Sequence, residues 1–396
     1  MVASFGLKLY NLGHRREAVA GSNRPARPGG TLLWMHAPSE AKAGPVLALA
    51  RRLIEDDRVG ILVTCAETLP SRDGVILQPP PGETPAEAKD FLDHWRPDVG
   101  VFFDGELRPT LLHQTSERRI PLLLVNANAP RFLRDRDGWY PGLMRTALSA
   151  FAEIMAVDEA SAKLFRKAGA PLTAVTGRME EESAVLPCLE PEREALANLL
   201  AARPVWFAAG LPANEEAVVL RAHKAAMQHS HRLLLILAPD DPSQATERAR
   251  RVEESEGWVV AQRALEQEPD PATEVFVVDN PAEYGLWYRL APITFLGGSL
   301  NGQGPTRGPM EAAALGSAIL HGPKTGRYGA IFGRLGAARA TRVVASPGDL
   351  SDALSDLLSP DRAARLAQLA WAIASDGAEA TELVLRRIRA LLDGEI

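Results

Sequence analysis

Short, continuously apolar runs alternate with helical stretches along almost the whole sequence. The runs lie at residues 31–35, 60–63, 75–77, 99–103, 121–125, 154–157 and 172–175, and again at 205–208, 233–237, 258–260, 275–278, 293–296, 318–321 and 341–344. Runs without strict polar and apolar alternation are typical of parallel strands that helices cover on both faces. The pattern therefore predicts an α/β fold with two doubly wound parallel sheets, whose ligands bind at the carboxyl ends of the strands.

The chain is expected to divide near its middle. Its 396 residues exceed what one ordinary core accommodates, so two domains of similar size are predicted. Residues 179–192 are acidic and punctuated by prolines, and they show no clear periodicity. A boundary in this stretch gives a basic segment at 1–30, a first Rossmann-like domain at 31–185 and a second at 186–396. The two domains are expected to face a cleft.

The composition excludes several classes of protein. Hydrophobic residues make up 46% of the chain and charged residues 24%, which is ordinary for a soluble globular protein. The formal charge of −6 argues against a general nucleic-acid binder. No apolar run has the length of a membrane span or the character of a signal peptide, so a cytoplasmic protein is predicted. Cys65 and Cys188 are far apart and support neither a disulfide framework nor a cysteine metal site.

The first thirty residues are basic. They contain one acid, Glu17, and their cations are Lys8, Arg15, Arg16, Arg24 and Arg27. Two interpretations stay open, which are contact with an anionic surface and a solvated tail.

A glycine-rich stretch follows the apolar run at 293–296. It reads GGSLNGQGPTRGPME from Gly297 to Glu311 and is predicted to enter a helix near Pro309. Glycines let the backbone approach a ligand closely, and the free N–H groups of a helix start favour phosphate. The stretch is thus predicted to bind an anion, with Glu311 accepting hydrogen bonds from ribose hydroxyls. Because neither the dinucleotide nor the phosphate-loop spacing is present, no redox cofactor or ATP is indicated, and a connection without a ligand stays an alternative.

Polar side chains at the predicted strand ends are the other candidates for chemistry, because ligands of such sheets bind there. In the first half these are His36, Ser39, Glu40, Asp104, Glu106, Asn126 and Asn128. In the second half they are Gly210, Asp240, Asp279, Glu283 and the stretches 297–311 and 322–327. Asp240 and Asp241 lack further nearby ligands, so no metal site is predicted.

Glu40 is the candidate general base, since a carboxylate beside a helix start can take the proton of an acceptor hydroxyl. The helix is expected to begin at Ser39 as its N-cap, with Glu40 in the first turn. The alternative for Glu40 is an ordinary acid that stabilises the helix dipole. Asp104 and Glu106 are interpreted either as a paired acid site or as part of a turn.

Several motifs resemble one known family. They are HAPSE at 36–40, GELRP at 105–109, IPLLLVNA at 120–127, VTG at 175–177, GGSL at 297–300, PMEAAALG at 309–316 and HGP at 321–323. In this order they resemble the 3-deoxy-D-manno-octulosonic acid (Kdo) transferases, over almost the whole chain from Thr31 onward.

The resemblance implies a GT-B glycosyltransferase fold and the transfer of Kdo from CMP-Kdo to a lipid A precursor at the inner membrane, in lipopolysaccharide biosynthesis. The CMP-activated sugar acid is then a substrate, and no cofactor is expected. The acidic catalytic positions that it implies are Glu40, Glu106 and Asp104. The donor is expected to contact Gly297, Gly298, Ser299, Gly304, Arg307, Glu311, Glu283, Pro239 and Lys324.

This sequence departs from the family pattern at several charged positions. The family motif H-A-x-S-V-G-E ends in the general base, and that position is Lys42 here, two residues after Glu40. A shift of two residues near a helix start rotates a side chain by about half a turn. The lysine of the family's G-N-L-K is Glu180, and the arginine of P-R-H-P is Asp240. The missing positive charge is expected to come from Arg307, Lys324 and Arg327.

Three functions stay open on the sequence. The first is a Kdo-type transferase in which Glu40 activates the acceptor hydroxyl and the leaving CMP is stabilised by the helix start and nearby cations. The second is a transferase that uses another nucleotide sugar. The third is a catalytically degraded paralogue that acts as a binding or scaffold protein. The expected location is the cytoplasm or the cytoplasmic face of the inner membrane, which the basic amino terminus would contact.

Overall fold

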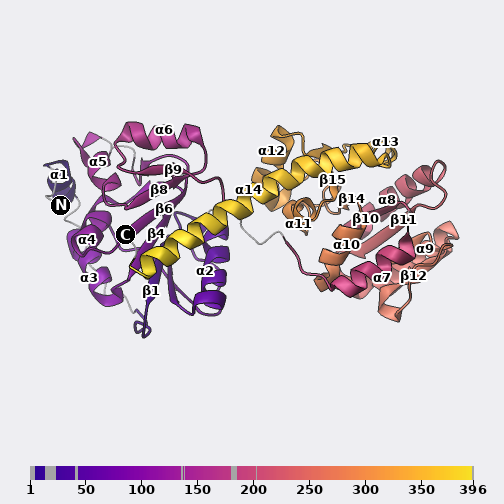
Figure 1. The fold of residues 1–396 in the computed structure, drawn as a ribbon, viewed down its shortest axis with the longest axis horizontal. Coiled ribbons are helices and arrows are strands. Elements are labelled where there is room, and N and C mark those ends of the chain that lie inside the picture. Colours follow the sequence, from indigo (N-terminus) through magenta and orange to yellow (C-terminus); the bar gives the residue numbers. More distant parts are fainter. Residues whose placement is uncertain are drawn as a thin grey trace. The chain divides into compact units, whose positions relative to one another are not determined.

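The chain forms two compact units. The computed structural model describes residues 5–13, 24–40, 43–134, 137, 139–179, 185–201 and 203–394. Unit 1 consists of residues 1–182 together with 376–396, and unit 2 consists of residues 183–375. Figure 1 shows the strands and helices of both units.

The main sheet of unit 1 has seven parallel strands in the described part of the chain, in the order β3-β2-β1-β4-β6-β8-β9. They are β1 (Leu32–His36), β2 (Gly60–Thr64), β3 (Val75–Gln78), β4 (Val99–Phe103), β6 (Leu122–Ala127), β8 (Glu153–Ala156) and β9 (Thr173–Val175). A separate pair is formed by β5 (Glu106–Leu107) and β7 (Arg131–Phe132). The helices are α1 (Phe5–Gly13), α2 (Gly44–Asp57), α3 (Pro85–Trp95), α4 (Pro109–Glu117), α5 (Leu143–Leu148) and α6 (Glu159–Ala168).

The sheet of unit 2 also has seven parallel strands among the described residues, in the order β12-β13-β11-β10-β14-β15-β16. They are β10 (Val205–Leu211), β11 (Leu234–Pro239), β12 (Val260–Gln262), β13 (Val275–Val277), β14 (Ile293–Leu296), β15 (Ala318–His321) and β16 (Thr341–Val343). The α-helices are α7 (Glu190–Leu200), α8 (Ala213–Met227), α9 (Ala245–Glu256), α10 (Tyr284–Leu290), α11 (Pro309–Ala314), α12 (Gly329–Ala337), α13 (Pro347–Leu357) and α14 (Pro360–Leu392). Short 3₁₀ turns are η3 (Pro242–Gln244), η4 (Arg263–Leu265), η5 (Pro281–Glu283) and η6 (Gly326–Tyr328).

Each sheet has a topological switch point at its first strand. β1 pairs with β2 on one side and with β4 on the other, and β10 pairs in the same way with β11 and β14. At such a point the connections leave in opposite directions, which opens a crevice outside the carboxyl ends of the strands. The predicted α/β fold of two doubly wound sheets is confirmed.

Burial on both faces explains why the strands are continuously apolar. In β1, Leu33 and Met35 belong to one core cluster, whereas Leu32 and Trp34 belong to the cluster on the other face. All four side chains are fully buried. The central strand β10 of unit 2 divides its residues between two clusters in the same way. A strand with helices on both sides has no face that tolerates alternating polar residues.

Two helices follow β16 in the described part of the chain. They are α13 and the 33-residue α14. Gly377 lies inside α14 without ending it, because apolar side chains on both sides of it are buried. Ala374 packs in a core cluster of unit 2, and Ala380 packs in one of unit 1.

The long α14 also changes the division of the chain. The sequence-based division assigned residues 186–396 to the second domain, whereas the segment 376–396 packs with unit 1. Val384, Leu385 and Ile388 are fully buried in the same cluster as β1 and α2. Arg389 adds ion pairs with Asp57 at the end of α2, the closer at 2.9 Å. Apolar and ionic contacts thus attach the final segment to unit 1.

Candidate functional site

The start of α2 lies later than the sequence suggested. The helix begins at Gly44 with Ala43 as its N-cap, so the prediction that Ser39 caps it is wrong. Pro45 lies in the first turn, where its missing N–H costs no hydrogen bond, and this favours a helix start at that point. Glu40 therefore precedes the helix instead of occupying its first turn.

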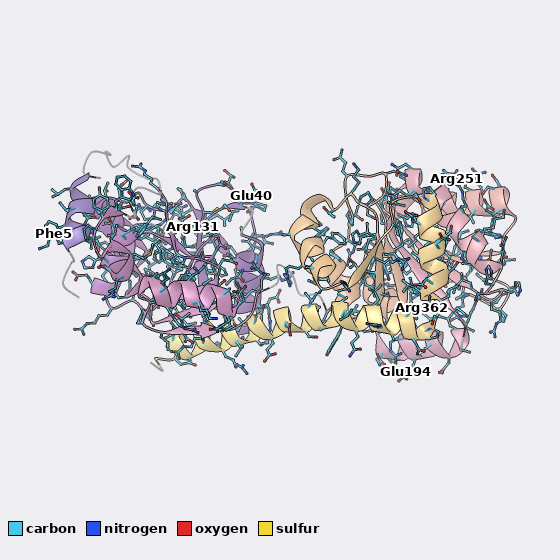
Figure 2. The ribbon with its side chains drawn as sticks, turned by 90° about the horizontal axis from the view of Figure 1, so that it is seen from above. Phe5, Glu40, Arg131, Glu194, Arg251 and Arg362 are labelled. Atoms are coloured by element: carbon cyan, nitrogen blue, oxygen red, sulfur yellow. The ribbon has the colours of Figure 1, made fainter. Side chains whose placement is uncertain are left out.

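Glu40 has an exposed side chain at the carboxyl end of β1, which Figure 2 labels. Its backbone N–H donates to Glu67 Oε2 at 2.6 Å, and its carbonyl accepts from Ala43 N at 3.0 Å. Within the described residues its carboxylate has no hydrogen bond or ion pair. The position of the family base, Lys42, lies outside the described residues.

Glu106 is a buried carboxylate, and one of its two oxygens contacts side chains of the protein itself. It is 7% exposed, and its Oε1 lies 3.1 Å from His36 Nε2 and 3.0 Å from Arg108 Nε. Burial by itself would raise the pKa of Glu106, but the hydrogen bond to His36 and the charge and hydrogen bond of Arg108 lower it below its ordinary value. Glu106 is thus a buried, ionised carboxylate whose Oε1 is engaged by His36 and Arg108.

His36 belongs to the same chain of hydrogen bonds. Burial lowers the pKa of His36, against the opposing effect of Glu106, so the ring is neutral at pH 7. A neutral ring that donates from Nε2 to Glu106 must accept at Nδ1, where Thr64 Oγ1 lies 3.0 Å away. Trp34 Nε1 in turn donates to Thr64 Oγ1 at 2.9 Å. Each polar group therefore has a partner, and His36 serves to hold Glu106.

Asp104 is similarly engaged at the carboxyl end of β4. It is 4% exposed and has a positive φ of 70°. Asn128 Nδ2 donates to its Oδ1 at 2.5 Å, and Arg131 Nη1 donates to its Oδ2 at 2.6 Å. Asn128 Oδ1 also accepts from Arg178 Nη2 at 2.8 Å. Asp104 thus organises the loops after β4, β6 and β9, which leaves Glu40 as the exposed acid among the three expected catalytic residues.

Glu83 is a buried acid that sequence reasoning missed. It lies just before α3 and is 6% exposed. Its Oε2 accepts from Thr110 N at 3.1 Å and Tyr10 Oη at 3.3 Å, whereas its buried Oε1 has no hydrogen-bond partner among the described residues. Burial raises the pKa of Glu83 to about 7, against the opposing charge of Arg108. Its sequence context, an acid before the Thr84 cap, does not distinguish it from an exposed helix-start residue.

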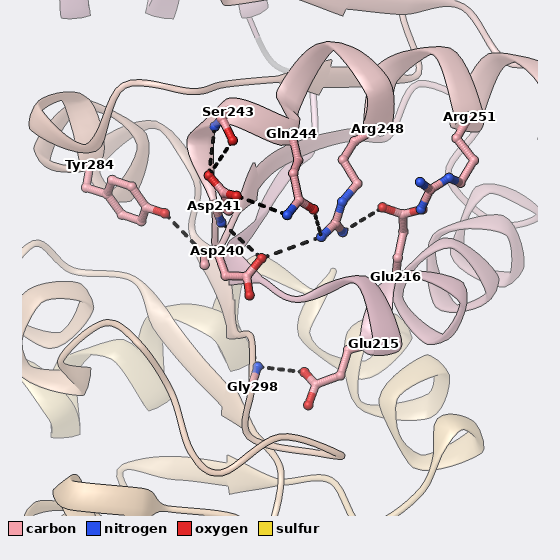
Figure 3. Close-up of polar contacts among 11 residues, drawn as sticks. Glu215, Glu216, Asp240, Asp241, Ser243, Gln244, Arg248, Arg251, Tyr284 and Gly298 are labelled. Atoms are coloured by element: carbon pink, nitrogen blue, oxygen red, sulfur yellow. Dashed lines mark hydrogen bonds and ion pairs between the residues drawn. The ribbon is translucent and has the colours of Figure 1, made fainter.

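In unit 2, the first half of the glycine loop surrounds a carboxylate of the protein itself. Glu215 lies in the first turn of α8, and its Oε2 accepts from Gly298 N at 2.8 Å. Its Oε1 accepts from the backbone N–H groups of Leu300 at 2.8 Å, Asn301 at 2.7 Å and Gly302 at 3.2 Å. Figure 3 shows Glu215 reaching Gly298. The N–H groups expected to bind a donor phosphate are thus occupied by this internal anion.

Ser299 is also part of the loop's internal structure. It is fully buried, and its hydroxyl donates to the Leu296 carbonyl at 2.5 Å and accepts from Gly322 N at 2.7 Å. Its own carbonyl accepts from Lys324 N at 2.8 Å. Ser299 therefore joins the loops that follow β14 and β15, and its side chain is unavailable to a sugar donor.

Two glycines of the loop are required by close backbone contacts. A Cβ on Gly297 would lie 2.5 Å from the Gly210 carbonyl oxygen, and one on Gly304 would lie 2.5 Å from Gly326 Cα. Gly304 also has a φ of 122°, which residues with side chains rarely adopt. These glycines bring together the loops after β10, β14 and β15 at the carboxyl edge of the sheet.

A cation, an acid and an aromatic ring meet at this edge. The Arg307 guanidinium carbon lies 4.3 Å from the centre of the Tyr284 ring, and Arg307 Nε lies 2.9 Å from Glu311 Oε2. Burial by itself would lower the pKa of Arg307, but Glu311 raises it above its ordinary value. Tyr284 Oη accepts from Gly210 N at 3.2 Å. The structure therefore brings together Arg307 and Glu311, which the sequence had separately assigned to the donor.

The other two expected cations lie near the same loop. Arg327 donates to Tyr328 Oη at 2.6 Å and to the Thr306 carbonyl at 3.4 Å, and its guanidinium lies over the Tyr328 ring. Lys324 is exposed, and its backbone N–H donates to the Ser299 carbonyl. Both cations thus lie in the loop after β15, which contacts the glycine loop through Gly304.

Glu283 and Pro239 have different surroundings. Glu283 Oε2 lies 3.1 Å from Arg263 Nε, and Arg263 also pairs with Glu192 of α7. This pair lines a cavity of about 730 Å³, whose other lining residues are Glu266, Glu268, Asp279, Asn280 and Pro281. The acidic lining does not favour phosphate. Pro239 is buried at the end of β11, where it pairs with Leu211 of β10.

Asp240, which replaces the family arginine, belongs to a buried ionic network with a cation from α9. Arg248 is 1% exposed, and its Nη1 lies 2.7 Å from Glu216 Oε2. Its Nη2 lies 3.2 Å from Gln244 Oε1 and 3.5 Å from Asp240 Oδ1. Arg251 pairs with Glu216 at 3.5 Å (Figure 3). The charge at this strand end is thus reversed, and an arginine eight residues later balances it.

Sequence comparison relates the chain to one family across both units. Residues 11–180 match the model of the 3-deoxy-D-manno-octulosonic-acid transferase (kdotransferase) family. A probable mitochondrial 3-deoxy-D-manno-octulosonic acid transferase of Arabidopsis thaliana is 27% identical over 361 residues, which cover 86% of this chain and 80% of that protein. The 3-deoxy-D-manno-octulosonic acid transferase of Haemophilus influenzae is 26% identical over 377 residues, which cover 92% and 88%.

Structural comparison agrees with the expected fold. The crystal structure of MurG from Acinetobacter baumannii has a TM-score of 0.51 and 12% identity, and the match covers 90% of this chain and 100% of that one. At this identity the likeness concerns the fold alone, and it confirms the GT-B arrangement of two Rossmann-like domains. The sequence similarity along most of the chain supports membership of the 3-deoxy-D-manno-octulosonic acid transferase family, whose members are glycosyltransferases.

Proposed function

We propose that this protein transfers Kdo, or a related sugar acid, from a CMP-activated donor to a lipid A precursor. The observation that supports this most is the similarity to Kdo transferases over 92% of the chain, which includes both units. The donor is expected to bind unit 2, and the acceptor to bind unit 1. Both units offer charged side chains at the carboxyl edges of their sheets, where such folds bind ligands.

The donor subsite is proposed at Arg307 and Glu311. A guanidinium stacked on an aromatic ring keeps N–H groups for hydrogen bonds. These N–H groups suit the phosphate or carboxylate of the CMP-activated sugar. Glu311 Oε2 accepts from Arg307 Nε at 2.9 Å, and this acid is suited to the ribose hydroxyls of CMP. Positive charge beside the departing phosphate would stabilise CMP as it leaves.

The acceptor base is proposed to be Glu40. In the reaction, the acceptor oxygen forms a bond to the anomeric carbon of the sugar, and the bond from that carbon to the CMP phosphate oxygen breaks. Glu40 takes the proton of the acceptor hydroxyl, and the electron pair of the broken bond leaves with CMP. The support for this role is that the Glu40 carboxylate is exposed and has no partner among the described residues. The carboxylates of Glu106 and Asp104, by contrast, contact other side chains of the protein.

CMP binding tests the proposed donor subsite. At a concentration one hundred times its Kd, CMP should add about 3 kcal/mol to the free energy of unfolding, seen as a rise in Tm. Arg307→Met should weaken CMP binding by about tenfold to a hundredfold, because a hydrogen bond to a charged group contributes about 1.5 to 3 kcal/mol. A thermal unfolding scan measures the rise in Tm, and calorimetric titration measures the affinity for CMP.

Arg365→Met provides the matched control, since it removes an exposed arginine of unit 2 on α14 and should leave CMP affinity unchanged. A Tm shift with a uridine nucleotide and none with CMP would replace the proposal with a transferase that uses another donor. Absence of any nucleotide binding would instead support a scaffold protein.

A peripheral membrane contact is proposed at the amino terminus. No helix in the described part of the chain is long and apolar enough to cross a bilayer. However, α1 buries Leu7 and Tyr10 while Phe5, Leu9 and Leu12 stay 71%, 38% and 56% exposed. These three positions recur every three or four residues, so they lie on one face of the helix. Lys8 adds an exposed cation to α1.

An exposed tryptophan precedes a residue that contacts α1. The rings of Tyr10 and Tyr140 lie 5.6 Å apart in an edge-to-face arrangement, and Trp139 is the residue before Tyr140. Trp139 is 88% exposed. Phenylalanine, leucine and tryptophan around a cation are the residues that place an amphipathic helix in a lipid interface. Figure 2 labels Phe5 on α1.

Vesicle binding tests this contact. Combined replacement of Phe5, Leu9, Leu12 and Trp139 by serine should weaken binding to vesicles containing phosphatidylglycerol by about tenfold or more, because apolar area no longer enters the interface. Trp371→Ser is the control, since it removes a 51% exposed tryptophan of α14 and should leave binding unchanged. Equal binding by the quadruple variant and the unaltered protein in a sedimentation assay would rule out this surface.

A further inference from the structure

The carboxylate of Glu215 accepts hydrogen bonds from several backbone N–H groups of one loop. Four N–H groups, spread over five consecutive residues from 298 to 302, donate to its two oxygens at 2.7 to 3.2 Å. Glu215 has no exposed surface. Backbone N–H groups can only donate, and an ionised carboxylate can only accept, so the arrangement suits the charged form of the side chain. A loop of this kind is an anion-binding device, and here its anion is covalently part of α8.

The held segment determines the path of the loop beyond it. Gly304 N donates to the Gly298 carbonyl at 3.0 Å, which closes the loop on the segment that Glu215 holds. Thr306 follows two residues later, and a Cβ on Gly210 would lie 2.3 Å from its Oγ1. Arg307 comes next and pairs with Glu311. The position of the Arg307 guanidinium therefore depends on a loop whose first half has Glu215 as its acceptor.

The neighbouring acid shows that this role is particular to Glu215. Glu216 lies in the same turn of α8 and is also buried, at 5% exposure. Its partners are the side chains of Arg248 and Arg251 on α9, on the opposite side from the glycine loop (Figure 3). Two adjacent buried carboxylates thus attach α8 to two different elements, and only one of them contacts the glycine loop.

We infer that Glu215 is the positioning residue of the donor site: its carboxylate acts as a built-in anion that holds the glycine loop in the shape that presents Arg307 to the donor. The inference rests on the proposed function for its consequence in catalysis, but the hold on the loop is a property of unit 2 that can be measured without a substrate. Removal of the carboxylate leaves four inward N–H groups around an empty space that a small carboxylate can enter.

Chemical rescue tests this inference in the full-length protein. Glu215→Ala should raise the KM for the CMP-activated donor by about tenfold or more, with a smaller change in kcat, because Arg307 is misplaced and the proposed base is untouched. Formate should lower the KM of this variant for the donor part of the way toward that of the unaltered protein. It should also raise the Tm of the variant, since its carboxylate can occupy the vacated position. Amide hydrogen exchange at 298–302 should be faster in the variant and slower again with formate.

Glu216→Ala is the matched control. It also removes a buried carboxylate from α8 and should lower the Tm, but formate should give no recovery and exchange at 298–302 should stay slow. Equal rescue of both variants, or unchanged exchange at 298–302 in Glu215→Ala, would overturn the inference. Glu215→Gln, which keeps one acceptor oxygen, should show intermediate exchange and serves if the alanine variant does not fold.

Failure of the proposed function is distinguishable from failure of this inference. In that case the unaltered protein shows no transfer, while the exchange and formate-dependent Tm measurements still report on the loop. If neither variant at position 215 folds, Glu215 is required by the whole of unit 2, and a role confined to the donor loop is excluded.

Discussion

Glu40→Gln is expected to slow transfer by about 10²- to 10⁴-fold, which is the usual contribution of general base catalysis. The amide of glutamine keeps the size of the side chain but cannot take a proton from the acceptor hydroxyl. Because the Glu40 carboxylate is exposed and has no partner among the described residues, its removal breaks no contact. The Tm and the affinity for CMP should therefore stay the same.

A rate assay with excess donor and acceptor measures this loss. Glu55→Gln is the matched control, because it neutralises another exposed acid on α2 and should leave the rate unchanged. If Glu40→Gln transfers sugar at the rate of the unaltered protein, Glu40 is not the base. A loss of rate accompanied by a large fall in Tm would indicate a structural role instead.

Glu83→Gln is expected to stabilise the protein at alkaline pH. Burial raises the folded-state pKa of Glu83 to about 7, compared with 4.5 for the free side chain. The folded protein therefore binds this proton more tightly than the unfolded chain does. The stabilisation associated with the bound proton is complete below about pH 4.5 and is lost as the pH rises through about 7.

Glutamine is neutral at every pH, so the variant does not share this loss. The difference in the free energy of unfolding, Glu83→Gln minus the unaltered protein, should rise by about 2 to 3 kcal/mol from pH 5 to pH 8. Urea denaturation at several pH values measures the difference. Glu55→Gln, at an exposed side chain on α2, should give a difference that does not change with pH. A flat difference for Glu83→Gln as well would mean that Glu83 is ionised in the folded protein throughout this range.

The fold was predictable because its signals are local. The strands at Val99–Phe103 and Ile293–Leu296 have the bounds that the sequence suggested, and α11 begins at Pro309 as expected. A fully buried strand needs several apolar residues in succession, and a proline in the first turn marks a helix start. Such requirements appear within a few residues, so a single sequence shows them. The start of α2 was missed because Ser39 offers a cap that the chain does not use.

Whether a side chain of the candidate site is free to bind a ligand depends on contacts between residues far apart in the sequence. Glu106 looks like a free acid in the sequence, yet His36, seventy residues earlier, occupies its oxygen. The glycine loop looks like an empty phosphate site, yet Glu215 fills its first half from 83 to 87 residues away. An acid beside a helix start has the same local sequence whether it faces water or a loop. Arg307 and Glu311, by contrast, are four residues apart on one segment, and the sequence did indicate their shared neighbourhood.

The path of α14 has a consequence for the order in which the protein matures on the ribosome. Unit 1 is synthesised first, but part of its core, including Val384, Leu385 and Ile388, belongs to the last segment of the chain. Until that segment is released, the apolar surface beside α2 has no cover, and such surfaces are the ones that chaperones bind and that aggregate. The half that emerges first is thus completed last, after all of unit 2 has been made.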